Sequence, residues 1–290
     1  MTSARSRARI RAARITETVM KGVTGSAAAL VVTSAVALLG YLLVRGLPSI
    51  SWEFLTGMPR TFMTQGGIWP AIVGTFWLTL GTAVFALPVG IAAGIYLSEY
   101  APRSRGTRLV RLSIANMSGV PSIVYALFGV ALFVSLMGLK VSIVAGSLTL
   151  ACLTLPVIIT ATEEALRQVP QDLRQAALAL GATRWRTIRT VVLPAAAPGI
   201  VTGSILGLSR AAGETAPILF TAAFFMAPLP KTPMDKVMAL PTHIYIMATQ
   251  PMKPAPHIVW GAALVLVAGV SIVNIAAATW RARARRKVTW

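Results

Sequence analysis

Long apolar stretches alternate with short polar ones along the whole chain. A helix that crosses the hydrocarbon core of a membrane needs about 20 mostly apolar residues, because each residue adds about 1.5 Å to a layer about 30 Å thick. Six stretches meet this requirement, and they run approximately over residues 26–44, 69–97, 112–136, 141–160, 195–225 and 257–280. The pattern therefore predicts an all-α, polytopic membrane protein with six transmembrane helices.

Composition agrees with this prediction and narrows the function classes. Hydrophobic residues make up 56% of the 290 residues and charged residues 12%, about half the charged share that is usual in soluble domains. The formal net charge of +19 comes from short clusters between apolar runs, without a nucleic-acid motif, so nucleic acid is not an expected partner. Cys152 is the single cysteine, so no intramolecular disulfide or cysteine-based metal site is expected. We interpret Cys152 as a small core residue.

Lys and Arg residues are divided unequally between the connections. The N-terminal segment, the second and fourth connections and the C-terminal segment hold twenty of the 27, and the opposite connections hold six. Lys and Arg are retained on the cytoplasmic side of bacterial membranes. The sequence thus predicts a multi-pass protein of the bacterial inner (plasma) membrane with both termini in the cytoplasm. The first apolar run is too long for a cleaved secretory signal, so we expect it to stay as an anchor.

The fourth connection, residues 163–194, is the one long segment expected in the cytoplasm. Residues 175–180 favour a helix, Gly181 can supply a left-handed turn, and Thr183 can cap a following helix. Residues 185–192 are amphipathic, with Trp185 and Ile188 on the apolar side. The segment is predicted to form a helix, a sharp turn and a second helix. From composition alone, this second helix either fills a groove in a partner or lies on lipid headgroups.

The chain carries no sequence motif for chemistry of its own. It has no Gly-rich phosphate loop that ends in Gly-Lys-Ser or Gly-Lys-Thr, so it is not expected to hydrolyse ATP. No pair of catalytic residues lies in a plausible pocket, and we do not expect an enzyme. His243 and His257 have no carboxylate or cysteine nearby in sequence; we interpret both as surface or interfacial residues rather than metal ligands.

Two charged residues, Arg210 and Glu214, lie well inside a predicted span. Each costs about 2.5 kcal/mol or more on insertion scales, so both should face protein or water. Four residues apart, they would share a helix face and pair. Pro217 predicts a kink or a local opening beside them. Ser209 and Thr215 flank the charges, and we expect them to line the same substrate pathway if the pair lies on one.

This pair has two interpretations. It either fixes the packing of helices or lines a transport pathway in which the Arg210 guanidinium binds an oxyanion. In the second case, Glu214 would hold Arg210 in place, compete with the anion for it, or accept a hydrogen bond from the P–OH group of hydrogenphosphate.

The fourth connection also resembles a known motif. Gln175, Ala176 and Ala177, followed by Gly181 and then by Leu193 and Pro194, resemble the EAA loop of bacterial ABC-importer permeases. In that family the loop docks into a cleft of the ATP-binding subunit. The resemblance implies that Gln175, Ala176, Ala177, Gly181, Ala182 and Trp185 couple this chain to an ATPase. Gln175 stands where the family often has Glu, so a charge contact at that position is not implied.

Three further segments resemble the PstA-type phosphate permeases of that family. They are residues 210–217 (Arg-Ala-Ala-Gly-Glu-Thr-Ala-Pro), 67–75 (Gly-Ile-Trp-Pro-Ala-Ile-Val-Gly-Thr) and 119–125 (Gly-Val-Pro-Ser-Ile-Val-Tyr). The sister permease of such systems usually has other residues after Gly-Glu-Thr. The resemblance implies a type I (MetI-like) importer core over residues 67–280 with the coupling loop at about 163–194. Residues 1–25 and 281–290 would be basic tails, and residues 26–66 a first helix outside a core of five, with its external connection.

The resemblance also implies partners and a function. The chain would pair with a second phosphate permease (PstC-like), two ATP-binding subunits (PstB-like) that hold ATP-Mg, and an extracytoplasmic phosphate-binding protein (PstS-like), all within or against membrane lipid. No cofactor would be bound by this chain itself. The alternatives are an ABC permease for another oxyanion or small solute, an ATP-independent secondary transporter or channel, and a membrane scaffold that transports nothing.

Overall fold

The computed structural model describes residues 2–249 and 255–286, and it describes side chains from residue 17 to residue 283 outside that gap. Most of the two predicted basic tails therefore lies outside the described side chains. In chain order the elements are α1 (Thr2–Gly46), η1 (Leu47–Ser49), α2 (Trp52–Thr56), β1 (Pro59–Arg60), β2 (Gln65–Gly66), α3 (Trp69–Ile95), η2 (Tyr96–Tyr100), α4 (Arg105–Met117), α5 (Ser122–Gly129), η3 (Val130–Leu136), α6 (Ile143–Arg167), α7 (Gln171–Ala179), α8 (Arg184–Thr187), η4 (Ile188–Val192), α9 (Leu193–Gly213), α10 (Ala216–Thr221), α11 (Leu240–Thr249) and α12 (Pro256–Arg286). Apart from one antiparallel pairing of β1 with β2 and one isolated parallel bridge between Ala223 and Val237, the described regular structure is helical.

Five described helices are long and apolar enough to cross a membrane. They cover Glu17–Ser49, Trp69–Tyr100, Ile143–Arg167, Arg184–Gly213 and Pro256–Arg283. The predicted third span, 112–136, is not one straight helix: α4 and the α5–η3 helix meet at a bend of 100°. Pro121 lacks a backbone donor and disfavours helical geometry at Val120, which explains the break. The pair counts as a sixth span only if both pieces are taken together.

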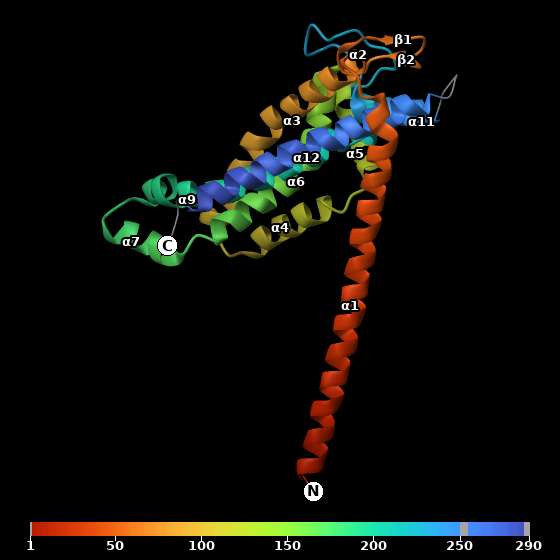
Figure 1. Cartoon of the computed structure of the whole chain (residues 1–290). Coiled ribbons are helices and arrows are strands. Elements are labelled where there is room, and N and C mark those ends of the chain that lie inside the picture. The colour runs from red at the N-terminus through yellow and green to blue at the C-terminus, as the bar shows by residue number, and fades with distance from the viewer. Residues whose placement is uncertain (1, 250–254, 287–290) are drawn as a thin grey trace.

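The helices of the bundle pack closely around α6. Its largest contacts are with α3 and α9, and α12 covers α9 from the other side (Figure 1). Gly94 of α3 lies against Thr162 of α6, and Gly203 of α9 lies against Ala161, so that a Cβ atom at either glycine would be within 2.6 Å of its neighbour. Small residues of this kind let helix backbones approach in a membrane.

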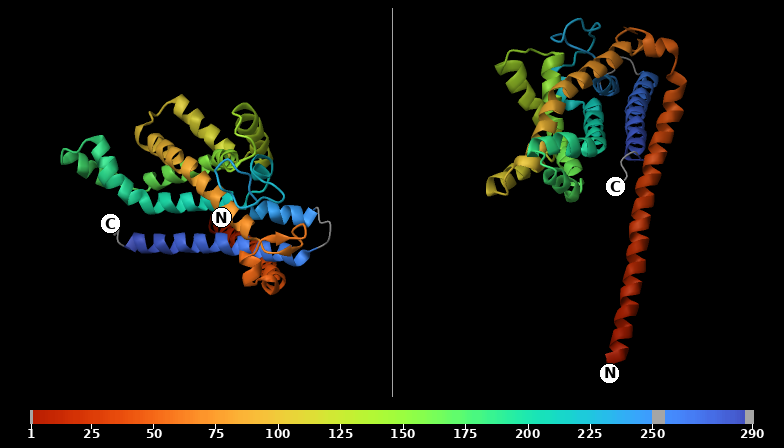
Figure 2. Two further views of the ribbon diagram at one scale, coloured as in Figure 1. Left: turned by 90° about the horizontal axis from the view of Figure 1, so that it is seen from above. Right: turned by 90° about the vertical axis from the view of Figure 1, so that its left-hand side faces the viewer.

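The first helix lies outside this bundle. Among the spans it packs mainly on α12, near its own C-terminal end, and Figure 2 shows these two helices side by side while the rest of α1 extends away. The Tyr41 ring meets the Trp260 ring edge-on at 5.2 Å, and Gly46 lies against the backbone of Trp260. Much of the remaining apolar surface of α1 is exposed.

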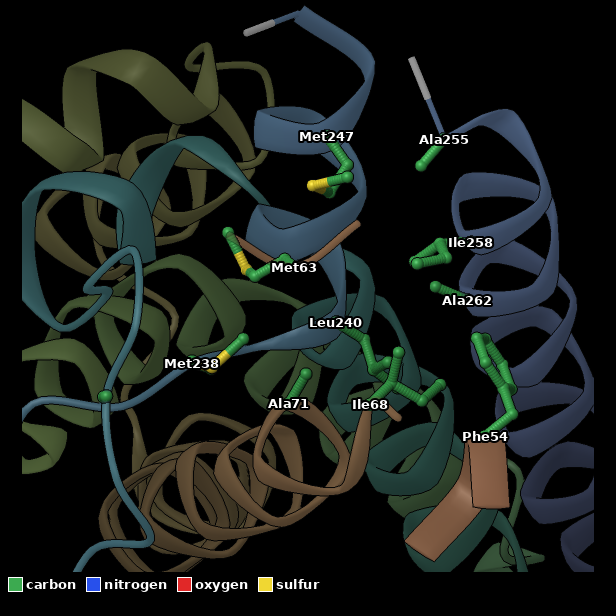
Figure 3. Close-up of a cluster of buried hydrophobic side chains, with 11 residues drawn as sticks. Phe54, Met63, Ile68, Ala71, Met238, Leu240, Met247, Ala255, Ile258 and Ala262 are labelled. Carbon is green, nitrogen blue, oxygen red and sulfur yellow. The ribbon is translucent and has the colours of Figure 1, made fainter. Parts of the chain in front are cut away.

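One end of the bundle carries a compact cap, which we define as α2, β1, β2, the segment 222–239 and α11 (Figure 1). The cap packs on the adjoining ends of α3 and α12, and the shared core contains the side chains in Figure 3: Phe54, Met63, Ile68 and Ala71 from the first half of the chain, and Met238, Leu240, Met247, Ala255, Ile258 and Ala262 from the second. The opposite end carries α7 and the C-terminal end of α12 (Figure 1).

The cap corrects one prediction from sequence. His243 is not at the surface: it is 2% exposed, and its Nδ1 lies 3.2 Å from Met63 Sδ. The residue is buried because α11 folds back onto α3 and α12. His257 is exposed, as predicted.

Candidate functional site

The predicted coupling segment forms a helix, a turn and a second helix. Helix α7 ends at Ala179, Gly181 has φ +81°, and Thr183 Oγ1 accepts a hydrogen bond from the Arg186 N–H at the start of α8. We call residues 175–185 the elbow. The helix–turn–helix prediction is confirmed.

The second arm of the elbow differs from the prediction. Residues 185–192 are not a separate surface helix, because α8, η4 and α9 run without interruption from Arg184 to Gly213. Ile188 and Val192 are buried rather than left for a partner or for lipid: η4 packs on α7, and Val192 shares a cluster with Leu166 of α6. Pro194 does not end the helix. It has no N–H to donate to the preceding turn, and that turn, η4, is π-helical.

The outer surface of the elbow is apolar and uncovered. Leu180 is 89% exposed, Trp185 is 57% exposed, and Leu178 is also exposed. Gln175, Ala176 and Gly181 are exposed, whereas Ala177 and Ala182 are partly buried. Large exposed apolar side chains at a glycine turn are typical of a contact surface for another protein.

Two acidic residues that sequence reasoning missed hold the base of the elbow. Glu99, in η2, binds Arg174 with Oε1 and Oε2 at 2.6 and 2.5 Å from Nη1. Glu163, in α6, accepts from Arg111 Nε at 2.8 Å and from Arg167 Nη2 at 2.6 Å. Glu99 and Glu163 are the only charged side chains among the buried described residues. Each lies near the polar end of an apolar run, and this position is the sequence signal that could have identified it.

The second predicted site lies where α9 ends. Arg210 is in the last turn of α9, and Glu214 is already extended at φ −72° and ψ 135°. Their Nε and Oε1 atoms are 3.4 Å apart, and the side chains are 50% and 16% exposed. The two residues pair as predicted, although Glu214 lies beyond the helix rather than on its face. The expected opening beside Pro217 is confirmed, because a new helix, α10, begins at Ala216.

The residues that flank this pair have separate surroundings. Ser209 Oγ bonds to Asn274 Oδ1 of α12 at 2.8 Å and lines an apolar cavity of about 350 Å³ between α3, α9 and α12. The Ser209 side chain therefore contacts α12. Thr215 is partly buried, and its carbonyl accepts the Leu219 N–H of α10 at 3.0 Å.

The break after Gly213 has a second break beside it. Helix α10 packs against α5, which begins just after the bend at Pro121. Tyr125 of α5 donates its hydroxyl proton to the Met117 carbonyl at 2.8 Å, across the same bend. Non-helical backbone at membrane depth is tolerated where it is buried in protein or lines a polar cavity. Paired breaks next to charged side chains are therefore typical of a solute pathway.

The sequence pattern of the family described as "Binding-protein-dependent transport system inner membrane component" matches residues 86–289. The chain belongs to this family. Its matched part includes the elbow, both breaks and the Arg210–Glu214 pair.

Relatives in this family cover most of the chain. A probable ABC transporter permease protein, YqgI of Bacillus subtilis, is 36% identical over 277 residues, which are 91% of this chain and 94% of the relative. The phosphate transport system permease protein PstA 1 of Mycobacterium tuberculosis is 40% identical over 230 residues, or 79% of this chain and 75% of the relative. PstA of Haemophilus influenzae is 33% identical over 234 residues, 81% of this chain and 82% of the relative.

Solved structures support the predicted fold class. A chain of a bacterial ABC transporter involved in import of the polysaccharide alginate matches with a TM-score of 0.63 at 15% identity, over 93% of this chain and 99% of that chain. A chain of the inward-facing MetNI methionine ABC transporter matches at 0.61 and 19% identity, over 75% and 97%. The fold is thus that of a type I, MetI-like importer permease.

Proposed function

We propose that this chain is a permease subunit of an ATP-driven importer and forms, with a second permease, the membrane pathway for inorganic phosphate. The observation that carries the proposal is the Arg210–Glu214 pair at the end of α9. Its contact is long and the Arg210 side chain is half exposed, which supports a guanidinium with donors available to an oxyanion. Relatives that bear the name of phosphate permeases support the choice of anion.

The elbow supplies the coupling in this proposal. Leu178, Leu180, Trp185 and the exposed Gln175–Ala176 edge dock into a cleft of an ATP-binding subunit (PstB-like), two copies of which hold ATP-Mg. This chain binds no cofactor and hydrolyses no nucleotide. With the elbow in the cytoplasm, both termini lie on that side of the membrane and the cap faces outward, toward a phosphate-binding protein (PstS-like).

Glu214 gives the pathway a basis for discriminating between anions. A carboxylate repels an anion unless the anion brings a proton, and hydrogenphosphate carries a P–OH group that can donate to it. Sulfate is fully ionised at neutral pH and has no such donor. The proposed arrangement therefore favours phosphate over sulfate, the best alternative oxyanion.

Reconstitution of the complete importer tests this function. The chain is placed in vesicles with its candidate second permease (PstC-like), the ATP-binding subunits and the phosphate-binding protein, and labelled phosphate uptake is measured with and without ATP. We expect uptake only when ATP and all the subunits are present, with little competition from sulfate. Uptake without the ATP-binding subunit would instead support an ATP-independent transporter, and preferential sulfate uptake would support another oxyanion.

A further inference from the structure

Both arms of the elbow are attached to the same turn of helix. Arg174 precedes Gly181 and binds the Glu99 carboxylate with Nη1, while Arg184 follows Gly181 and donates from Nη2 to the Glu99 carbonyl. The Arg184 guanidinium also lies over the Tyr100 ring, 5.2 Å from its centroid. The elbow is therefore a loop with its two ends fastened to η2, the last turn of the span that begins with α3.

The Glu99 attachment is buried and shared by several segments. The side chains of Glu99 and Arg174 are 7% and 14% exposed. Arg174 Nη2 also donates to the Leu166 carbonyl at 2.7 Å, which ties the same guanidinium to the end of α6. A guanidinium held by three contacts has one arrangement, because its planar fork fixes the direction of every bond.

The tip of the elbow lacks attachments of this kind. Between Gln175 and Thr183 no described residue forms an ion pair, and Leu180 and Gly181 are exposed. Displacement of the tip by a docked partner is therefore resisted at its two ends, at Glu99. Because Glu99 lies at the end of the span that begins with α3, this force on the tip acts on α3. The opposite end of α3 reaches the cap, where Thr75 Oγ1 accepts a hydrogen bond from the Leu240 N–H at 2.8 Å.

We propose that Glu99 is a positioning residue that transmits motion of the elbow to α3 and so couples ATP hydrolysis by the partner to opening of the membrane pathway. This inference rests on the proposed function. A purely structural ion pair would stabilise the chain without changing how much solute moves for each ATP hydrolysed.

The test is the ratio of phosphate transported to ATP hydrolysed by the complete importer in vesicles. Glu99→Gln keeps the shape of the side chain and removes its charge. We expect the variant to retain its ATP-binding subunit and to hydrolyse ATP, while the ratio falls about tenfold or more, within the usual range of coupling between sites. Glu164→Gln, at an exposed acid near the same end of α6, is the matched control and should leave the ratio unchanged.

A wild-type ratio in Glu99→Gln would overturn the inference. If that variant does not accumulate, Arg174→Lys decides: it keeps the charge but loses the planar fork. A lower ratio in Arg174→Lys supports transmission through this contact, and an unchanged ratio contradicts it. Failure of the wild-type importer to take up phosphate with ATP would count against the proposed function and not against the attachment at Glu99.

Discussion

Two Arg–Glu pairs in this chain differ in how tightly they are made. At the base of the elbow, Arg174 and Glu99 approach to 2.5 Å with little exposure. At the end of α9, Arg210 and Glu214 are 3.4 Å apart, and half of the Arg210 side chain is exposed. The first guanidinium makes three short contacts to protein, although its buried Nε has no partner among the described residues, whereas the second makes one long contact. Identical residue types thus form a short, buried contact in one place and a longer, more exposed contact in the other.

The neighbourhood of each pair strengthens this contrast. Near the elbow, Glu163 joins α4 to α6 through Arg111 and binds Arg167 as well. Around Arg210 the helix ends and the backbone is irregular on both sides of the α5–α10 contact. Short, buried ion pairs thus hold the elbow end of the bundle, whereas the backbone around Arg210 is irregular.

The largest expected effect is a difference in unfolding free energy between variants of the two Arg–Glu pairs. Arg174→Ala leaves the Glu99 charge buried without its partner, which should cost about 3 to 5 kcal/mol of unfolding free energy. Arg210→Ala removes a long, exposed contact and should cost less than about 1 kcal/mol. Thermal unfolding of the two variants in the same detergent measures both. Equal losses would show that the two pairs do not differ in the way described.

The cap allows a second test, because its buried titratable group has no charged partner. Burial lowers the pKa of His243 from its ordinary 6.5 to about 4, and the residue lies outside the five spans. Between these two values the unfolded chain binds the extra proton, so stability is complete above pH 6.5 and falls as the pH drops toward 4. The loss should approach about 3 kcal/mol.

Unfolding at pH 8 and at pH 4.5 checks this expectation, with His243→Met as the comparison. The variant should lose less stability on acidification than the wild type. An identical pH dependence in the two proteins would mean that His243 is not the responsible group.

Glycine substitutions separate strain from coupling. Gly181 and Gly138 have φ of +81° and +67°, and neither would meet another atom within 4 Å of an added Cβ. Gly181→Ala and Gly138→Ala should therefore lose similar stability, about 1 to 2 kcal/mol each. We expect only Gly181→Ala to reduce retention of the ATP-binding subunit on co-purification. Equal retention in the two variants would exclude the Gly181 turn from docking.

The smallest expected change in stability comes from Glu214. Glu214→Gln should shift the unfolding free energy by less than about 1 kcal/mol, because the pair is long and its arginine is exposed. Glu163→Gln, which removes the charge from two short contacts, should shift it more. Phosphate uptake should nevertheless fall in Glu214→Gln. A variant that is both stable and fully active would leave Glu214 without a part in the pathway.

Much of the fold followed from local pattern. Apolar runs located the spans because hydrocarbon requires about 20 apolar residues whatever the packing. Gly181 and Thr183 predicted the elbow because a left-handed turn and a helix cap are local properties. Pro217 indicated the opening in the fifth span in the same way.

Features that depend on tertiary contacts were not predictable from these patterns. Pro121 also broke a span, but its run of apolar residues read as one helix. Nothing local to Glu99 indicates Arg174, which is 75 residues away, and the burial of His243 depends on α11 folding back. The sequence therefore predicted only part of the candidate site. Arg210 and Glu214 were found, whereas the ion pairs of Glu99 and Glu163 and the break at Pro121 were not.

Contact between Arg210 and the anion is tested most directly by ATP-driven phosphate uptake in the complete importer carrying Arg210→Ala. We expect uptake to fall about tenfold or more, because a charge-assisted contact to an anion is lost, while the ATP-binding subunit still co-purifies in wild-type amount. Wild-type uptake in this variant would contradict the claim that Arg210 lies on the route of the anion.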